Sequence, residues 1–436
     1  MNQILQNKQK VVLEISGLTC EILQFLGGGG QGEVYKAEVS GKPMAVKWYF
    51  PHMSTFDQRK SLEALIKMGA PSNRFLWPID LASARGIKGF GYVMPLREPH
   101  FKNIVDLMKR TVEPSFRSLC TAGFQLADSF LQLHAKGLSY RDISFGNVFF
   151  DADSGNILIC DNDNVAVDNK VKAGVLGTPR FMAPEIVRGQ SQPSTQTDLF
   201  SLAVLLFYLF MVAHPLEGKK EAQIKCFDLP AMTKLYGTEP VFIFDPHDDS
   251  NRPVPGLHDN ATAFWAIYPG FFKEIFTRAF TDGIKDPVNG RVRESEWRST
   301  MIRLRDLIFY CPACQAENFL DPDAKGAPKI CWSCTKHLPD PYLLKVGKHI
   351  IALNKGTRLY PHHVDDTHMY DFSQHIAEVV SHPTDPNRLG LKNLGKTPWK
   401  FITPDGASQE VAPEKSAAIH DGNKINFGSL EGIICR

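Results

Sequence analysis

Two short polar segments, close together in the sequence, constrain this chain more than any other feature. The first, YRDISFGN, covers Tyr140–Asn147 and places an asparagine five residues after Asp142. The second, ICDNDNVAV, covers Ile159–Val167 and holds two aspartates and two asparagines within an otherwise apolar run. Either one of these acids holds a metal ion, or the second segment is an acidic turn and nothing more.

The bulk properties of the chain exclude several classes of protein. Its 436 residues are enough for two or three domains, and 43% hydrophobic with 22% charged residues is typical of a soluble globular protein. A formal net charge of +2 gives no reason to predict nucleic acid or an acidic surface as a partner. The first ten residues lack the apolar core of a signal peptide. Five of the nine cysteines are scattered, which favours a reducing, cytoplasmic location.

The longest apolar stretch, LFSLAVLLFYLFMVA, covers Leu199–Ala213. Its 15 residues fall short of the roughly 20 that a membrane-spanning helix needs. We therefore predict a buried helix here and no membrane span.

A glycine-rich segment, LGGGGQGEVYKA, covers Leu26–Ala37 and is followed by strand-like residues. Glycines let the backbone approach phosphates and point its N–H groups at them. Glu33 stands where a P-loop needs lysine, and the following strand argues against a Rossmann turn, which opens a helix. Alone, the segment fits a glycine-rich turn as well as a nucleotide site. The G-x-G-x-x-G-x-V spacing is met by Gly27, Gly29, Gly32 and Val34.

Lys47 ends the apolar strand MAVKW, and Glu63 is the only glutamate between Lys47 and Arg97. Here the chain resembles a protein kinase, in which such a lysine contacts the phosphates of ATP and pairs with a helix glutamate. Helical spacing over Asp57–Lys67 fits that helix, with Leu62, Leu65 and Ile66 on one face. Without the resemblance, Lys47 reads as a surface strand lysine and Glu63 as a solvated helix residue.

The resemblance continues over most of the first 300 residues and implies an α+β, bilobal protein kinase fold. The segment GTPRFMAPE, Gly177–Glu185, is similar to the end of a kinase activation segment. TDLFSLAVLLF is similar to the central helix that follows it, in which Asp198 would brace the catalytic loop. In GRVRESEW, Arg291 would pair with Glu185.

The resemblance also implies roles for the two polar segments. Asp142 would accept the proton of the substrate hydroxyl, while Asn147 and Asp161 would hold Mg²⁺ or Mn²⁺. Asp163 has three readings: a residue beside the metal, an additional ligand, or an acid that stabilises the turn. The full set of implied catalytic residues is Asp142, Lys47, Glu63, Asn147 and Asp161. The implied ATP contacts are Gly27, Gly28, Gly29, Gly30, Gly32, Val34, Ala45, Lys47, Met94, Asn147 and Asp161.

Two departures from the kinase pattern bear on activity. Ser144 replaces the lysine usually found two residues after the catalytic aspartate, which removes a cation from the γ-phosphate. Asn162 stands where a phenylalanine normally joins the hydrophobic spine, and Asp163 stands where a glycine gives hinge freedom. The leading hypothesis is an active serine/threonine protein kinase that phosphorylates itself or a partner protein. The alternative is a nucleotide-binding pseudokinase that recruits partners through its C-terminal domains.

The stretch from Asp161 to Gly177 contains no serine, threonine or tyrosine. In kinases that are switched by phosphorylation, Arg141 would meet a phosphate there. We predict that this chain needs no activation-loop phosphate, with Asp168 as a permanent substitute charge.

Four clustered cysteines form the pattern C-x₂-C-x₁₆-C-x₂-C: Cys311, Cys314, Cys331 and Cys334. Two such turns present four thiolates to one ion, which predicts a closed, structural Zn²⁺ site over disulfides or free thiols. The nearby PHHVDDTH, which contains His362 to His368, lacks a known ligand spacing and is predicted to be a solvated loop.

These patterns divide the chain into a kinase N-lobe at 1–98, a C-lobe at 99–308, a zinc ribbon at 309–340 and a small β-sandwich at 341–436. The last is loosely similar to a degenerate forkhead-associated domain, but the serine and arginine that bind phosphothreonine are not evident. The whole arrangement resembles kinases of bacterial phosphorylation triads, some tied to tellurite resistance. That resemblance implies a von Willebrand A protein and a PPM-type phosphatase as partners.

Overall fold

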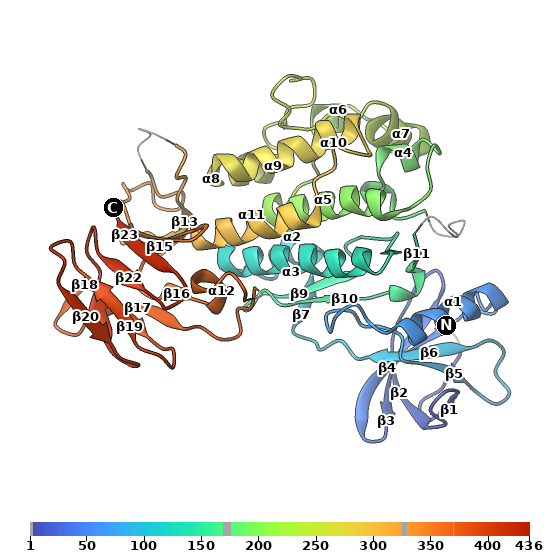
Figure 1. Ribbon diagram of the computed structural model, residues 1–436. Helices are drawn as coiled ribbons and strands as arrows, with labels where there is room; N and C mark the ends of the chain where they lie inside the picture. Colours follow the sequence, from blue (N-terminus) through green and yellow to red (C-terminus); the bar gives the residue numbers. More distant parts are fainter. Residues whose placement is uncertain (1–2, 169–175, 325–328, 369) are drawn as a thin grey trace. The chain divides into compact units, whose positions relative to one another are not determined.

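The computed structural model describes residues 3–168, 176–324, 329–368 and 370–436. The chain divides into two compact units, one formed by residues 1–265 and 274–298 and the other by 266–273 and 299–436. Figure 1 shows the order of the elements along the chain. The first unit holds both polar segments, and the second holds the four clustered cysteines.

The first unit begins with a closed barrel whose strand order is β1-β2-β3-β4-β6-β5. Side chains alternate across a strand, so β4 has two distinct faces. Val46 and Trp48 point into the barrel core, while Ala45 and Tyr49 pack with Leu62 of helix α1. This alternation puts Lys47 on the face that α1 covers. The elements are β1 Lys10–Leu13, β2 Thr19–Gly28, β3 Gly32–Val39, β4 Lys42–Tyr49, α1 Phe56–Met68, β5 Asp80–Ser83 and β6 Gly91–Pro95.

The turn between β2 and β3 brings its backbone close to β4. A Cβ atom at Gly32 would lie 2.1 Å from the carbonyl oxygen of Trp48, which no side chain can do. Glycine at this position is therefore required by the approach of β3 to β4, whatever the turn binds.

Helix α1 covers the predicted helical span Asp57–Lys67 and one further residue at each end. The hydroxyl of Thr55 caps it by accepting the N–H of Gln58 at 3.2 Å, and Gly69 ends it with a left-handed φ of 70°. Leu62 and Leu65 are buried, as the helical spacing predicted.

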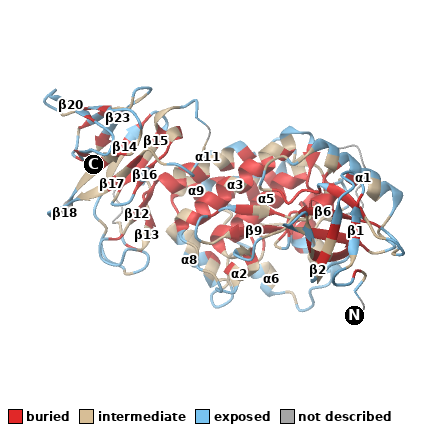
Figure 2. Cartoon of the chain, turned by 90° about the horizontal axis from the view of Figure 1, so that it is seen from below, coloured by how far each residue is buried: buried red, intermediate tan, exposed pale blue. Residues whose placement is uncertain are grey.

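The rest of the first unit is mostly helical. Helix α5, which contains the long apolar stretch, is buried at every residue from Thr197 to Met211, so the predicted buried helix is confirmed. Helix α3 is also buried over most of its length (Figure 2). Within the described ranges, no helix combines the length and apolar character needed to cross a membrane. The α-helices between residues 99 and 306, of which α8, α9 and α11 include residues of the second unit, are α2 Ile104–Met108, α3 Phe116–Ala135, α4 Pro184–Val187, α5 Thr195–Met211, α6 Lys219–Ala222, α7 Leu229–Thr233, α8 Asp259–Ile267, α9 Gly270–Phe280, α10 Asp282–Lys285 and α11 Glu294–Asp306.

Short strands flank the two polar segments. Strand β9 follows the first segment and pairs antiparallel with β10, which opens the second, with Val148 opposite Ile159. This hairpin brings residues from both segments to the same end of a three-stranded sheet, of order β10-β9-β7. The elements are β7 Phe101–Asn103, β8 Leu138–Ser139, β9 Val148–Asp151, β10 Ile157–Ile159, the 3₁₀ turn η1 Asn162–Asn164, β11 Ala166–Val167 and the 3₁₀ turn η2 Pro179–Phe181.

The second unit is built mainly from two β-sheets, of order β15-β14-β23-β22-β19-β20 and β16-β17-β18-β21. One core contains side chains from both, for example Leu344 from the first sheet and Leu391 from the second. The elements are β12 Ile308–Tyr310, β13 Glu317–Phe319, β14 Tyr342–Val346, β15 His349–Leu353, β16 Arg358–Leu359, α12 Pro361–Val364, β17 Ala377–His382, β18 Asp385–Asn393, β19 Trp399–Ile402, β20 Ser408–Val411, β21 Ser416–Ala418, β22 Lys424–Asn426 and β23 Glu431–Cys435.

The predicted solvated loop at PHHVDDTH is wrong for two of its histidines. His362 and His363 are 2% and 0% exposed, because Pro361 opens the short helix α12 and turns them inward. Nε2 of His363 lies 3.1 Å from a carboxylate oxygen of Asp306, and Nδ1 accepts the N–H of Tyr360 at 3.1 Å. A neutral ring that accepts at Nδ1 carries its proton on Nε2, so this histidine donates to Asp306 and has no lone pair for a metal.

A buried ion pair, Arg291 with Glu185, gives the fold a testable feature. Nη2 of Arg291 donates to both carboxylate oxygens of Glu185, at 2.8 and 2.9 Å, and the arginine side chain is 2% exposed. Replacing Arg291 with methionine would leave a buried, unpaired carboxylate, which costs about 3–5 kcal/mol. We expect Arg291→Met to lower the free energy of unfolding in urea by that amount.

The control is Arg278→Met, because Arg278 pairs with Glu296 while 45% of its side chain is exposed. Exposed pairs contribute below about 1 kcal/mol. Equal losses in the two variants would contradict a stabilising role for the buried pair.

Candidate active site

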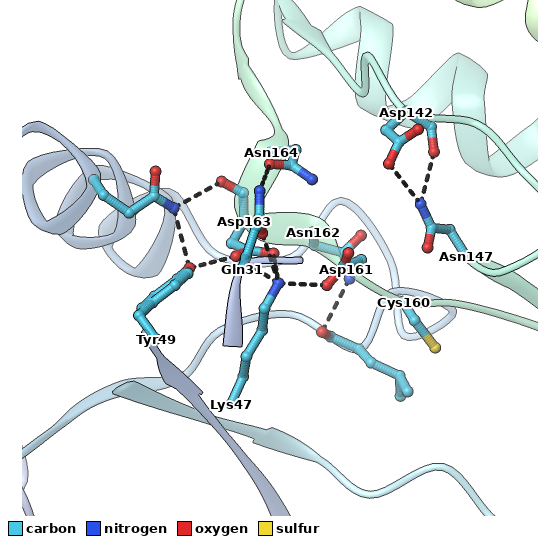
Figure 3. Close-up of polar contacts among 12 residues, drawn as sticks. Gln31, Lys47, Tyr49, Asp142, Asn147, Cys160, Asp161, Asn162, Asp163 and Asn164 are labelled. Atoms are coloured by element: carbon cyan, nitrogen blue, oxygen red, sulfur yellow. Dashed lines mark hydrogen bonds and ion pairs between the residues drawn. The ribbon is translucent and has the colours of Figure 1, made fainter. Parts of the chain in front are cut away.

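The hairpin of β9 and β10 joins the two polar segments. The N–H of Cys160 donates to the carbonyl oxygen of Asn147 at 2.8 Å, so Asn147 lies beside the residue that precedes Asp161. The amide Nδ2 of Asn147 in turn donates to the backbone carbonyl of Asp142 at 2.8 Å and to its carboxylate at 3.2 Å. Figure 3 shows Asp142 and Asn147 on one side of the site and Asp161 in its centre.

Asp198 of α5 holds the start of the first polar segment by hydrogen bonds to its backbone. Its carboxylate accepts the backbone N–H of Tyr140 at 2.5 Å and that of Arg141 at 2.9 Å. The hydroxyl of Tyr140 donates to the carbonyl of Cys160, which ties this loop to the second segment. Arg141 has a left-handed φ of 75°, a conformation that non-glycine residues hold only where their surroundings fix it.

Lys47 is the centre of charge in the site. Its ammonium donates to Asp161 at 2.6 Å, to both carboxylate oxygens of Asp163 at 2.9 and 3.0 Å, and to the side-chain carbonyl of Gln31 at 3.0 Å. An ammonium has three N–H groups, and three residues therefore share all of them. The Lys47 side chain is only 5% exposed, so this charge depends on its acidic neighbours.

The two aspartates beside Lys47 are not equivalent. The side chain of Asp163 is fully buried and also accepts the hydroxyl of Tyr49. Burial opposes the charge of Asp163, but Lys47 and Tyr49 outweigh it and lower the pKa of this carboxyl below its ordinary value. Asp161 is 37% exposed; burial and the neighbouring charge of Asp163 raise its pKa. Asp163 thus makes a buried ion pair, whereas Asp161 faces the open side of the site.

The predicted pair of Lys47 with Glu63 is wrong in this structure. Glu63 accepts from Nε of Arg59 at 3.2 Å and is 48% exposed. The reason is helical geometry: successive residues turn by about 100°, so Gln58, four residues before the buried Leu62, faces the site instead. The side-chain amide of Gln58 donates to the hydroxyl of Tyr49 at 3.0 Å.

Asn162 replaces a hydrophobic contact with hydrogen bonds. It is fully buried, and its Nδ2 donates to the backbone carbonyls of Leu76 and Ile159 at 2.9 and 3.0 Å. The side chain therefore anchors the second polar segment to the chain that follows α1. Sequence reasoning identified Asn162 as an altered spine residue but not this anchor.

The glycine-rich turn lies next to Lys47 through Gln31, a residue that the sequence patterns did not single out. Its carbonyl accepts from Lys47, and its Nε2 donates to Asn164 of η1 at 2.9 Å. Gly29 closes the turn by donating to the carbonyl of Gly32 at 2.9 Å. The predicted ATP contacts occupy the adjoining strands: Gly27 and Gly28 end β2, Val34 lies in β3, and Ala45 of β4 lies opposite Met94 of β6.

Part of the predicted regulatory segment, residues 169–175, lies outside the described residues. Just before it, Asp168 accepts the N–H and hydroxyl of Thr195 at 3.0 and 3.2 Å. Burial lowers the pKa of Arg141, and the charges of Asp198 and Asp168 oppose that shift. Just after the segment, the hydroxyl of Thr178 donates to Asp142 at 2.9 Å, a contact that the sequence did not reveal.

The clustered cysteines of the second unit lie close enough to share an ion. The sulfurs of Cys311 and Cys334 are 3.6 Å apart, and those of Cys314 and Cys331 are 3.7 Å apart. Four Zn–S bonds of about 2.3 Å at tetrahedral angles require about 3.8 Å between sulfurs, whereas a disulfide requires about 2 Å. Burial opposes the thiolate of Cys331, but hydrogen bonds from the backbone of Cys334 and its neighbours outweigh it and lower the pKa to about 6.

Comparison with known proteins gives the site a family context. Residues 98–264 match the protein kinase domain family. The matched range contains both polar segments together with Glu185 and Asp198. The glycine-rich turn and Lys47 precede the matched range.

Relatives of the chain include protein kinases from distant organisms. It is 26% identical over 212 residues to the DNA damage-responsive serine/threonine-protein kinase RqkA of Deinococcus radiodurans, covering 47% of this chain and 31% of that protein. It is 28% identical over 207 residues to a probable cell cycle serine/threonine-protein kinase of Encephalitozoon cuniculi (46% and 43%). It is 30% identical over 213 residues to rat protein kinase C delta type (46% and 30%). The chain thus matches less than half the length of each relative.

His134, at the end of α3, supports Asp198 and was not singled out from the sequence. Its Nε2 lies 3.2 Å from the carboxylate of Asp198, and its Nδ1 contacts Glu294. Burial would lower the pKa of His134, but the hydrogen bonds to Asp198 and Glu294 outweigh it and raise the pKa from 6.5 to about 9. The histidine is therefore charged at neutral pH and joins two acids.

This shift predicts the pH dependence of stability. Because the folded pKa lies above the ordinary value, the stabilisation is fully present below pH 6.5 and is lost as the pH rises through about 9. The stability difference between wild type and His134→Gln should therefore be largest below pH 6.5, at most roughly 3 kcal/mol, and shrink towards pH 9. Urea unfolding at a series of pH values measures it.

The control is His247→Gln, since His247 is exposed. A difference for His134→Gln that stays constant from pH 6 to about 9.5 would contradict the assignment of a charged histidine.

Proposed function

We propose that this chain is an ATP-dependent protein kinase that transfers the γ-phosphate to serine or threonine hydroxyls. The observation that carries the proposal is the convergence of Asp142, Asn147 and Asp161 at one end of the β9–β10 hairpin, with Lys47 beside them. The kinase domain match and the serine/threonine kinases among the relatives support it.

The residues fit a divalent cation. Asp161 is accessible, and the two aspartates outnumber the single ammonium of Lys47, which leaves a net negative charge. Because Asn147 donates through Nδ2 to Asp142, its carbonyl oxygen is the atom that points elsewhere, and oxygen ligands suit Mg²⁺. Asn147 and Asp161 would hold Mg²⁺ or Mn²⁺, which neutralises charge on the transferred phosphoryl group.

The remaining steps belong to side chains of the chain itself. Asp142 takes the proton from the attacking hydroxyl, and Thr178 and Asn147 orient its carboxylate by hydrogen bonds. Lys47 binds the α- and β-phosphates, and the turn Gly27–Gly32 approaches the phosphates with its backbone. To bind a phosphate, Lys47 must release at least one of its present partners, of which Gln31 is the neutral one.

Several finer expectations belong to the same proposal. The hydroxyl-free activation segment argues that no phosphate on it is needed, with Asp168 supplying the fixed charge near Arg141. The resemblance to bacterial phosphorylation triads suggests a von Willebrand A protein and a PPM-type phosphatase as partners. The two sheets of residues 341–436 would form the partner-contact domain, similar to a forkhead-associated domain.

The four cysteines support a second part of the proposal, a structural Zn²⁺ site in a zinc ribbon at 309–340. The sulfur spacing near the tetrahedral value favours four thiolates around one ion. Thiolates that are kept reduced for metal binding fit a cytoplasmic location.

One observation favours a second candidate function, a pseudokinase that binds nucleotide without transferring phosphate. Ser144 stands where kinases use a cation beside the γ-phosphate, and it is 8% exposed. Losing a positioned charge from a phosphoryl-transfer site costs several kcal/mol of transition-state stabilisation by order of magnitude.

An assay of phosphate transfer separates the active kinase from the pseudokinase. Purified full-length chain with Mg²⁺ or Mn²⁺ and γ-labelled ATP should label itself or casein. Asp142→Asn removes the proton acceptor and should lower the rate about 100-fold or more. Asp161→Asn removes a metal ligand and should act in the same direction.

The matched control is Asp153→Asn, because Asp153 is an exposed aspartate in the turn between β9 and β10. It should leave the rate unchanged. A wild-type chain that binds ATP and transfers no phosphate would support the pseudokinase instead.

The zinc content of the chain tests the proposed Zn²⁺ site. Elemental analysis of the purified chain should find one zinc per chain, and Cys331→Ser should abolish it and destabilise the second unit. Cys226→Ser is the control, since Cys226 is an exposed cysteine of the first unit. Wild-type protein prepared under reducing conditions and without chelator that contains no zinc would contradict the proposed site.

A further inference from the structure

We propose that Asp163 is the positioning residue that holds Lys47 for phosphate binding, in place of a glutamate from helix α1. This inference rests on the proposed phosphotransfer function and concerns how its site is kept ready. Its consequence is that the lysine stays paired whatever the position of α1.

The contacts of Asp163 tie it to strand β4 at two points. Both of its carboxylate oxygens accept from Lys47, at 2.9 and 3.0 Å, and one also accepts the hydroxyl of Tyr49. Lys47 and Tyr49 are two residues apart on β4 and so point to the same face. Figure 3 shows Asp163 between these two side chains. Because Asp163 is also held by Tyr49, it fixes the position of the Lys47 ammonium.

The other partners of Lys47, Asp161 and Gln31, cannot supply a fixed anion for it when nucleotide is bound. Asp161 is 37% exposed and is the metal ligand of the proposed reaction, so its charge is shared with the cation when nucleotide binds. Gln31 is neutral. Asp163 has a fully buried side chain and remains as the fixed anion for an ammonium that is itself 5% exposed. A buried ammonium without such an anion is strongly destabilised.

Helix α1 keeps a different role. Its Glu63 pairs with Arg59, and its inward contacts are the apolar Leu62 and the amide of Gln58, which donates to Tyr49. A swing of α1 would remove the Gln58 contact but would leave the Lys47–Asp163 pair intact. On this inference, the pairing of Lys47 does not depend on a glutamate of α1, because its buried partner belongs to the turn η1.

The experiment uses the full chain and two readouts. The first is labelled γ-phosphate transfer, with kcat and KM for ATP determined separately. The second is the rate at which an acetylating reagent labels the Lys47 amine, followed by peptide mass spectrometry, and this readout does not require activity. Asp163→Asn should lower kcat roughly 100-fold, because a misplaced lysine no longer meets the phosphates, and should raise Lys47 labelling several-fold.

Glu63→Gln is the discriminating variant and should change neither readout, and Asp153→Asn again serves as the control for an exposed acid. If Asp163→Asn does not fold, Tyr49→Phe replaces it, because that change removes one hydrogen bond to Asp163 and leaves Glu63 untouched. Tyr49→Phe should shift both readouts in the same direction as Asp163→Asn, by less.

Two results would overturn the inference: an increase in Lys47 labelling with Glu63→Gln, or unchanged labelling with both Asp163→Asn and Tyr49→Phe. A wild-type chain without phosphotransfer would defeat the proposed function alone, since the labelling comparison still decides which acid holds Lys47.

Discussion

The site depends on one buried positive charge, the ammonium of Lys47. A charge removed from water needs fixed partners, and two aspartates of a single turn supply them. Two local rules bring the groups together. Alternation along β4 points Lys47 to the face that α1 covers, and the antiparallel pairing of β9 with β10 delivers the acidic turn beside the loop of Asp142.

The turn that holds Asp161 and Asp163 carries one more negative charge than Lys47 balances. It can therefore pair with the lysine and also bind a cation. Asp163, fully buried, balances Lys47, while Asp161, partly exposed, adds a negative charge on the open side. A divalent cation is the natural partner for that second charge. Asp161 has a left-handed backbone with φ of 54°, and the amide of Asn162 holds the turn against the chain that follows α1.

The parts that could be predicted from sequence were those set by local pattern. The long apolar run predicted the buried helix α5, and helical spacing placed Leu62 and Leu65 inward. The partner of Lys47 could not be predicted from the sequence because it depends on tertiary contacts. Glu63 is the only glutamate in range, but it follows the buried Leu62 by one residue and so points about 100° away from the buried face of the helix. The role of Asp163 could not be predicted because its direction depends on the local backbone: residues i and i+2 share a face in a strand but not in a 3₁₀ turn. In the structure Asp161 precedes the 3₁₀ turn η1, which contains Asp163, and both carboxylates reach Lys47.

The central claim is that Asp163, and not an acid of α1, holds Lys47 in the nucleotide-bound state. A crystal structure of the full chain with Mg²⁺ and a non-hydrolysable ATP analogue tests it most directly. The account predicts that the nucleotide and metal displace Gln31 and Asp161 from Lys47, while both oxygens of Asp163 stay within hydrogen-bond distance and Glu63 remains with Arg59. A structure in which α1 rotates to bring Glu63 onto Lys47, and Asp163 is released, would contradict it.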